Sequence, residues 1–244
     1  MKPRIALATA GRNLQQLKAD PRTVALIVAV PSLLLTLLYF VYDGGVRFTP
    51  IAVSMLGILP MLVMFLITSV AMLRERTTGT LERLLTTPLH RADLLAGYGA
   101  AFALAALVQS AVLVAISVWF LGVDTRGSIL WVLLVAVFAA AVGVATGLLA
   151  SAFARTEFQA VQFMPLFIGP QVFLCGLLAP REQMPDVLRW VSDCLPMTYA
   201  VDALKAVAAQ PNPATDVLRD VGVLAAFAVG ALVLAALSMP RRTR

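Results

Sequence analysis

The charged side chains best suited to hold a partner gather in residues 74–88, R-E-R-T-T-G-T-L-E-R-L-L-T-T-P, between two long apolar runs. Gly79 interrupts the helical pattern, and Thr80 can cap a new helix that has Glu82 in its first turn. Leucines then form an apolar ridge with arginines on its flanks. We expect a two-turn helix that fits a groove on another protein. The alternative is a solvated loop without a partner.

The predicted contact residues of this segment supply charge, a helix break and cap, or the leucine ridge. They are Arg74, Glu75, Arg76, Gly79, Thr80, Leu81, Glu82, Leu84 and Leu85. Membrane insertion does not need these residue types, which favours a role in binding.

Catalytic chemistry has no comparable pattern in this chain. The sequence contains neither the G-x-x-x-x-G-K-[ST] loop that cradles nucleotide phosphates nor the G-x-S-x-G turn of serine hydrolases. The single histidine, His90, lies in a charged loop, and metal-ligand types do not cluster. Cys175 and Cys194 are too few for a disulfide framework. We expect both to be thiols, although a bridge between them is geometrically possible. We predict no catalytic residue, metal or cofactor in this chain.

The elements that must position these residues are membrane-spanning helices. The chain is 60% hydrophobic and 13% charged, whereas a soluble domain carries about 25% charged residues. Six stretches approach the roughly 20 apolar residues that cross a bilayer: 23–42, 51–73, 94–121, 129–154, 158–179 and 221–239. A barrel would show alternating segments of about ten residues instead. The sequence therefore predicts an all-α polytopic membrane protein, one domain over residues 1–244.

The distribution of charge predicts the orientation. With both termini in the cytoplasm, 13 of the 19 basic residues fall on the inner side and 8 of the 13 acidic residues on the outer side. This agrees with the excess of Lys and Arg in cytoplasmic loops. Basic residues at membrane edges meet anionic lipid, so the net charge of +6 does not indicate nucleic acid. We expect a multi-pass protein of the inner (plasma) membrane, and the excess of Arg over Lys is typical of GC-rich bacteria.

Three shorter segments complete the predicted domain. Residues 3–20 alternate polar and apolar groups at helical spacing, which predicts an interfacial helix within residues 1–22 on the inner leaflet. Residues 74–89 form the cytoplasmic helix described above. Residues 180–216 predict two short, half-buried external helices that cap the bundle between the fifth and sixth spans.

Two stripes of small residues fit the spacing at which helix backbones approach closely. We expect both to pack within one chain, with a dimer seam as the alternative. The stripes are Ala139, Gly143 and Gly147, and Gly222, Ala226 and Gly230.

The fifth stretch, residues 158–179, is unusual because it combines amides, aromatic rings, Pro165 and Pro170. Amides are costly facing lipid, so they should face protein or a cavity. Adaptable aromatic and methionine side chains suit varied apolar ligands. The alternative is that the glutamines bond only to neighbouring helices. No span carries a charged residue in its middle, so transport would need energy from a second subunit.

Three segments together resemble the type-2 ABC transporter permeases, six-helix membrane subunits of exporters whose ATPase is often a separate chain. E-R-T-T-G-T-L-E-R-L-L-T-T-P at 75–88 resembles the coupling helix after the second span. F-L-C-G at 173–176, with Pro180 and the Met-Pro pair at 184–185, resembles the exit of the fifth span. L-P-M-T-Y-A-V-D-A-L at 195–204 resembles the external pattern before the last span. The size and the D-P-R at 20–22 look most like drug and antibiotic efflux members.

The resemblance implies a permease subunit that exports a drug, antibiotic or lipid-like molecule and takes part in multidrug resistance. Its implied partners are two cytosolic P-loop ATPase subunits, which hold ATP and Mg²⁺, and a second permease copy or a homologue. The implied path lies at the dimer interface, and our candidates to line it are Met61, Met64, Phe65, Thr68, Phe163, Phe167 and Gln171. The alternative function is a non-transporting membrane scaffold or sensor component.

Overall fold

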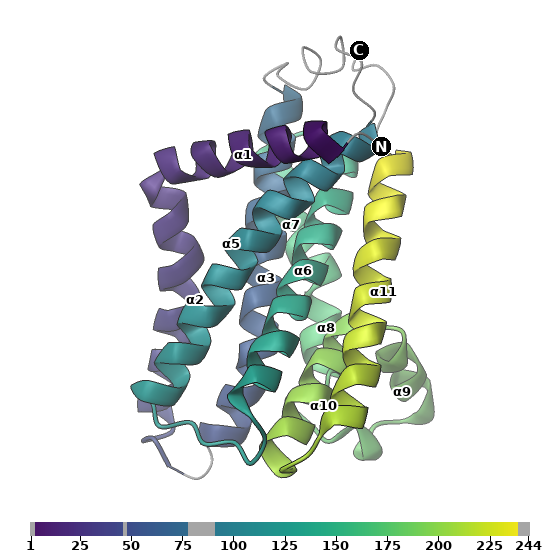
Figure 1. The fold of residues 1–244 in the computed structure, drawn as a ribbon. Helices are drawn as coiled ribbons and strands as arrows, with labels where there is room; N and C mark the ends of the chain where they lie inside the picture. Colours follow the sequence, from purple (N-terminus) through teal and green to yellow (C-terminus); the bar gives the residue numbers. More distant parts are fainter. Residues whose placement is uncertain (1–2, 46–47, 78–90, 239–244) are drawn as a thin grey trace.

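The computed structural model describes residues 3–45, 48–77 and 91–238, and every regular element within these ranges is a helix (Figure 1). The all-α prediction is therefore confirmed. Five of the described helices are long and apolar enough to cross a membrane. They are α2 (Pro21–Val41), α3 (Phe48–Thr77), α5 (Arg91–Trp119), α6 (Ile129–Phe153) and α11 (Ala214–Ser238). They stand side by side as one upright bundle (Figure 1).

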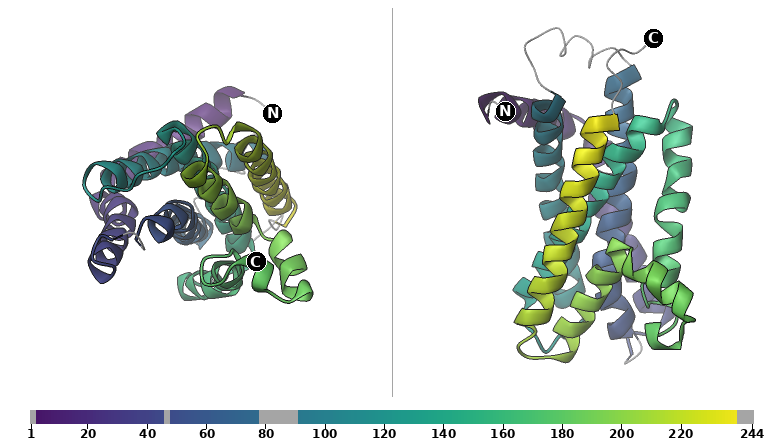
Figure 2. Two further views of the ribbon diagram at one scale, coloured as in Figure 1. Left: turned by 90° about the horizontal axis from the view of Figure 1, so that it is seen from below. Right: turned by 90° about the vertical axis from the view of Figure 1, so that its right-hand side faces the viewer.

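The fifth predicted stretch is helical in two pieces rather than one. Helix α7 (Glu157–Phe167) and helix α8 (Gly169–Leu174) meet at Ile168. Pro170 lies in the first turn of α8, where its missing N–H is tolerated, whereas inside a continuous helix it would remove a hydrogen bond. The two pieces follow one another along one side of the bundle (Figure 2, right). The number of six spans stays a prediction.

Helix α1 (Pro3–Ala19) lies across one end of the bundle, nearly at right angles to the spans (Figure 1). The helix predicted over residues 3–20 is thus present, and its place on a membrane surface stays a prediction. Asp20 joins α1 to α2 by accepting hydrogen bonds from the Thr23 amide at 3.3 Å and the Thr23 hydroxyl at 2.6 Å. This N-cap begins the first span at a sharp corner.

Helix α3 forms the centre of the bundle, and α6 packs closely against it. A Cβ atom at Gly147 would lie 2.5 Å from the Phe65 carbonyl oxygen, and one at Gly143 would collide with the Met61 carbonyl. Only glycine permits this approach. Packing within one chain is confirmed for this stripe.

The second small-residue stripe does not pack in this way. Gly222, Ala226 and Gly230 of α11 are exposed, and a Cβ at either glycine would meet nothing within 4 Å. The expectation that this stripe packs inside the chain is wrong, because α11 turns the opposite face towards α6 and α10.

The end opposite α1 carries three short helices, η1 (Arg181–Gln183), α9 (Asp186–Asp193) and α10 (Pro196–Ala209) (Figures 1 and 2). Helix α10 is buried more deeply than the half-buried external helix predicted from the sequence. Its Ala200 and Leu204 are fully buried and lie against Gly57 of α3, where a Cβ would be 3.3 Å and 2.9 Å from them. The last span also begins at Ala214 rather than at residue 221, so Asp216 occupies its first turn, where a carboxylate is favourable.

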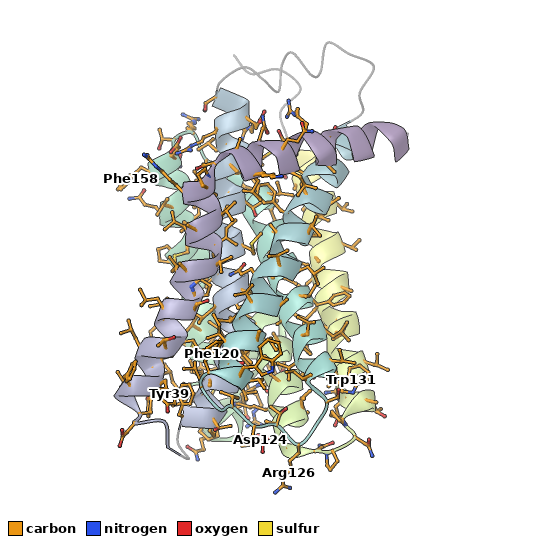
Figure 3. All side chains as sticks on the ribbon, turned by 60° about the vertical axis from the view of Figure 1, so that its left-hand side comes forward. Tyr39, Phe120, Asp124, Arg126, Trp131 and Phe158 are labelled. Atoms are coloured by element: carbon orange, nitrogen blue, oxygen red, sulfur yellow. The ribbon has the colours of Figure 1, made fainter. Side chains whose placement is uncertain are left out.

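Two features of the bundle agree with the predicted membrane embedding. Tyr39 and Trp131 lie towards the end opposite α1, as Figure 3 shows, and the amphipathic rings of Tyr and Trp are enriched at membrane interfaces. The described segments predicted to be cytoplasmic, namely α1, the end of α3 and the α6–α7 turn, all lie at the other end (Figure 1). The structure therefore separates the two sets of charges, and the direction across the membrane stays a prediction.

Candidate functional site

Three consecutive residues at the end of α3 connect this helix to different parts of the chain. Arg74 pairs with Glu157 of α7, Glu75 with Arg12 of α1, and the Arg76 guanidinium donates to the Ser151 carbonyl of α6. The sequence predicted Arg74, Glu75 and Arg76 as partner contacts. The structure shows that they also join four helices at the point where the predicted coupling segment begins.

The Arg74–Glu157 pair has two parallel hydrogen bonds. Arg74 Nε donates to Glu157 Oε1 at 2.7 Å, and Nη2 donates to Oε2 at 3.0 Å. Both side chains are at least half exposed, so the pair contributes less than about 1 kcal/mol to stability. Its bidentate geometry instead fixes the direction of the contact between α3 and the start of α7.

The Glu75 contact is more enclosed. Arg12 Nη2 donates to the Tyr98 hydroxyl at 2.8 Å and lies 3.4 Å from Glu75 Oε2. Tyr98 is buried, and the Glu75 side chain is 13% exposed. The interaction holds α1 against α3 and α5 at one place.

The rest of the predicted coupling segment lies outside the described residues. This applies to Gly79, Thr80, Leu81, Glu82, Leu84 and Leu85. Their contact with a partner stays a prediction.

The path residues predicted on α7 lie next to one on α3. The ring centres of Phe65 and Phe167 are 6.0 Å apart, and those of Phe167 and Phe163 are 6.3 Å apart in an edge-to-face arrangement. Phe65 is fully buried, whereas Phe163 and Phe167 are half-buried. These three rings form a continuous aromatic cluster between α3 and α7.

The other α3 candidates lie inside the chain. Met61, Met64 and Thr68 have no exposed surface, and the Thr68 hydroxyl donates to the Met64 carbonyl at 2.6 Å. Met64 packs with Tyr98 and Phe102 of α5, on a different side from the aromatic cluster. In a single chain these three residues line no surface, and their place in a path stays a prediction.

Gln171 acts as a connector in this structure. Its Nε2 donates to the Phe167 carbonyl at 2.7 Å, and its Oε1 accepts from the Met197 amide at 3.2 Å. The side chain is buried. The Oε1 end of the amide therefore holds α8 against the start of α10, and the Nε2 end bonds to the last residue of α7, as the alternative proposed for the glutamines predicts for Gln171.

An ionic network at the opposite end ties the short helices together. Arg181 donates to Asp202 at 2.6 Å and also pairs with Asp193. Lys205 Nζ donates to the carbonyl of Gly176, which has a positive φ of 82°. Burial raises the pKa of Asp202, and the nearby Arg181 opposes that shift. Cys175 is buried and Cys194 is exposed, and both are free thiols as expected.

Comparison with known proteins decides the family. A family model described as ABC-2 type transporter matches residues 6–208. The chain belongs to the ABC-2 type transporter family. The match runs from α1 to α10, so in this ABC-2 protein it includes both the end of α3 and the aromatic cluster.

Several curated proteins are similar to this ABC-2 chain. The linearmycin resistance permease protein LnrN of Bacillus subtilis is 30% identical over 156 residues, which are 64% of this chain and 40% of LnrN. The probable multidrug ABC transporter permease YbhS of Escherichia coli is 29% identical over 203 residues, 80% of this chain and 54% of YbhS. ABC transporter G family member 20 of Dictyostelium discoideum is 31% identical over 141 residues, 58% of this chain and 19% of that protein. The chain spans about half or less of the length of these relatives.

Sequence reasoning about this ABC-2 chain missed the partners of the α3 end. Arg12, Tyr98 and Glu157 were not singled out, because each lies more than 60 positions from the residue it contacts or in a different helix. The one available signal was the charge of Glu157 directly after Thr156, which caps α7 by accepting from the Gln159 amide. Nothing in the sequence connects that carboxylate with Arg74.

Proposed function

We propose that this chain is the membrane-spanning permease subunit of an ATP-driven exporter, which moves a hydrophobic or amphipathic molecule out of the cytoplasm. The observation that supports this proposal most strongly is the ABC-2 family match over residues 6–208. Two relatives whose names describe permeases for linearmycin resistance and for multiple drugs support a drug, antibiotic or lipid-like substrate.

The energy would come from two cytosolic P-loop ATPase subunits that hold ATP and Mg²⁺ and bind residues 74–88. The junction at the end of α3 supports this role. Arg74, Glu75 and Arg76 attach α3 to α7, α1 and α6, so a movement of the segment after Thr77 would pull on three helices at once. In this scheme the ATPase subunits hydrolyse ATP and the permease does not.

A second permease copy, or a homologue, would complete the path. Both termini would lie in the cytoplasm and the spans in the inner membrane. The half-buried Phe163 and Phe167 are the path candidates that a partner could reach, with Phe65 directly behind them. Phe158 and Leu166 of α7 and Phe173 of α8 are exposed, which leaves an apolar surface for the second copy.

The test is co-expression of the chain with a candidate P-loop ATPase, most simply one encoded by an adjacent gene. The purified complex in vesicles should hydrolyse ATP, and amphipathic drugs should stimulate hydrolysis several-fold. ATP should also drive accumulation of the drug on the outer side. A complex that forms but neither responds to any drug or lipid analogue nor moves one would favour the alternative, a scaffold or sensor component.

A further inference from the structure

A cavity of about 630 Å³ lies beneath α1, at the corner where α1 turns into α2. Its walls come from α1, α2, α3, α5 and α7. Leu26 of α2 and Val161 of α7 line it and are exposed, whereas Tyr98 and Phe102 of α5 line it and are buried. The cavity therefore leads from a mouth on the lipid-facing side of the bundle to a floor on α5.

One end of the cavity is polar, and a side chain that lines it has a buried hydrogen-bond donor that is not used. Asn13 lines the cavity and is 6% exposed. Its Oδ1 accepts from Arg12, but its Nδ2 has no hydrogen-bond partner among the described residues. A buried amide without a partner costs about 1–3 kcal/mol. A ligand with an acceptor oxygen at this position would remove that cost.

The charges around the polar end are nearly balanced. Glu75 pairs with Arg12, and Arg74 pairs with Glu157. Asp20 also lines the cavity, and its carboxylate accepts from the neutral Thr23. A headgroup that carries both an acceptor anion and a small cation matches this end better than a purely anionic one.

The remaining walls are apolar and, apart from Leu17 of α1, lie on the spans. They are formed by Leu17, Leu66, Ile67, Val70, Ala71 and Phe102. The volume falls within the roughly 300–1,000 Å³ of ligand pockets, which are mostly apolar with a few placed polar groups. An extended hydrocarbon chain fits walls of this kind.

We propose that this cavity binds one membrane phospholipid with a zwitterionic, primary-amine headgroup. One acyl chain enters between α2 and α7 and lies against Phe102. On binding, the Asn13 side chain turns towards the cavity so that Nδ2 donates to a phosphate oxygen, and the ammonium group lies near the Asp20 carboxylate. The site belongs to a single chain and does not depend on transport, on an ATPase or on a second permease.

The test uses the full chain in vesicles of phosphatidylethanolamine and phosphatidylglycerol that contain a trace of phosphatidylethanolamine with a photoreactive acyl chain. Adducts are mapped by peptide mass spectrometry. Leu104 lies two residues further along α5, on a nearly opposite face; it is 45% exposed and reports lipid around the bundle, whereas Phe102 is 6% exposed and reports lipid inside the cavity. We expect adducts at Phe102 at least as abundant as those at Leu104. Adducts at Leu104 alone would overturn the proposal and leave water as the occupant.

Filling the cavity gives the matched test. Ala71→Trp should lower the Phe102 adducts at least fivefold and leave those at Leu104 unchanged, which also shows that the bundle is folded. Ala226→Trp, on the exposed face of α11, should change neither. Phe102 adducts that persist in Ala71→Trp would overturn the cavity as the binding site.

The headgroup assignment has its own variants. Asn13→Asp replaces the free donor by a carboxylate that repels phosphate, and should lower the Phe102 adducts at least fivefold. Gln15→Glu adds the same charge on an exposed position of α1 and should have no effect. Asp20→Asn keeps the helix cap but should reduce a preference for photoreactive phosphatidylethanolamine over photoreactive phosphatidylglycerol about threefold. Equal labelling of the wild type by the two lipids, or equal losses in Asn13→Asp and Gln15→Glu, would overturn the assignment.

Discussion

The guanidinium group of Arg74 holds the carboxylate of Glu157 through two hydrogen bonds of 2.7 and 3.0 Å, across 83 positions of sequence. The pair joins the end of α3 to the first turn of α7. Because α7 carries Phe163 and Phe167, this contact links the start of the predicted coupling segment with the helix that supplies two rings of the aromatic cluster.

Breaking this pair should weaken the coupling between drug binding and ATP hydrolysis more than it lowers the stability of the permease. Arg74→Ala should lower the free energy of unfolding by less than about 1 kcal/mol, because the pair is exposed. Drug-stimulated ATP hydrolysis should fall several-fold, and the exchange Arg74→Glu with Glu157→Arg should restore part of it. Arg189→Ala removes a similar exposed pair within α9 and should leave coupling intact. Equal coupling in Arg74→Ala and the wild type would contradict the prediction.

The leucine ridge after α3 should be needed for binding of the ATPase. Leu81→Asp or Leu84→Asp would force a carboxylate into an apolar groove, which costs several kcal/mol, so co-purification of the ATPase should drop at least tenfold. Thr86→Asp adds the same charge off the ridge and should have a small effect. The permease should still insert, because the segment lies outside the predicted spans. Undiminished co-purification of both leucine variants would show that residues 74–88 are only a loop.

The contact between α6 and α3 should tolerate no side chain at Gly143. Gly143→Ala would bring a Cβ against the Met61 carbonyl, and such overpacking costs about 1–3 kcal/mol. The matched change Gly230→Ala lies in open space on α11 and should be neutral or slightly stabilising. Thermal unfolding in detergent measures both. A Tm of Gly143→Ala equal to that of Gly230→Ala would contradict the close packing.

The ionic network around Arg181 should make stability depend on pH. The pKa of Asp202 is raised by burial and held down by Arg181, so Arg181→Ala should raise it further. When the pKa of a carboxyl group is higher in the folded than in the unfolded state, its contribution to stability is greatest at low pH. That contribution is lost as the pH rises through the pKa of the folded state. Arg181→Ala should therefore cost more stability at pH 8 than at pH 5. Adding Asp202→Asn should abolish this difference, and a pH-independent loss in the single variant would exclude Asp202 as its cause.

The aromatic cluster should influence which molecules are exported. Phe167→Ala removes the ring that contacts both Phe65 and Phe163, and should shift the relative transport of aromatic and aliphatic drugs by about tenfold. Assembly with the ATPase should be unchanged. Phe153→Ala, at an exposed position at the end of α6, is the control. Identical drug preferences in the two variants would remove the cluster from the path.

Apolar runs predicted most of the bundle because burial in lipid depends on local composition. Helices α2, α3, α5, α6 and α11 all lie where such runs occur. The break at Ile168 was not predicted, since Pro165 remains inside α7 while Pro170 begins a new helix. The deep burial of α10 was also missed, because its contact with Gly57 joins residues far apart in sequence.

The candidate site was only partly predictable for a related reason. Charge and resemblance indicated Arg74, Glu75 and Arg76, since these residues flank an apolar run. Their partners depend on how α1, α6 and α7 end near one another in space. Gln171 shows the converse, because its amide type was noticed from the sequence but its two backbone partners, one at the end of α7 and one at the start of α10, depend on how these helices meet.

The three neighbouring contacts at the end of α3 leave from a single helical turn. Successive residues of an α-helix point about 100° apart, so Arg74, Glu75 and Arg76 reach three directions from a single turn. A rotation of that turn which moves one side chain out of register moves all three. The last turn of α3 is therefore a common attachment point, through which a movement of the segment that follows would reach α1, α6 and α7 together.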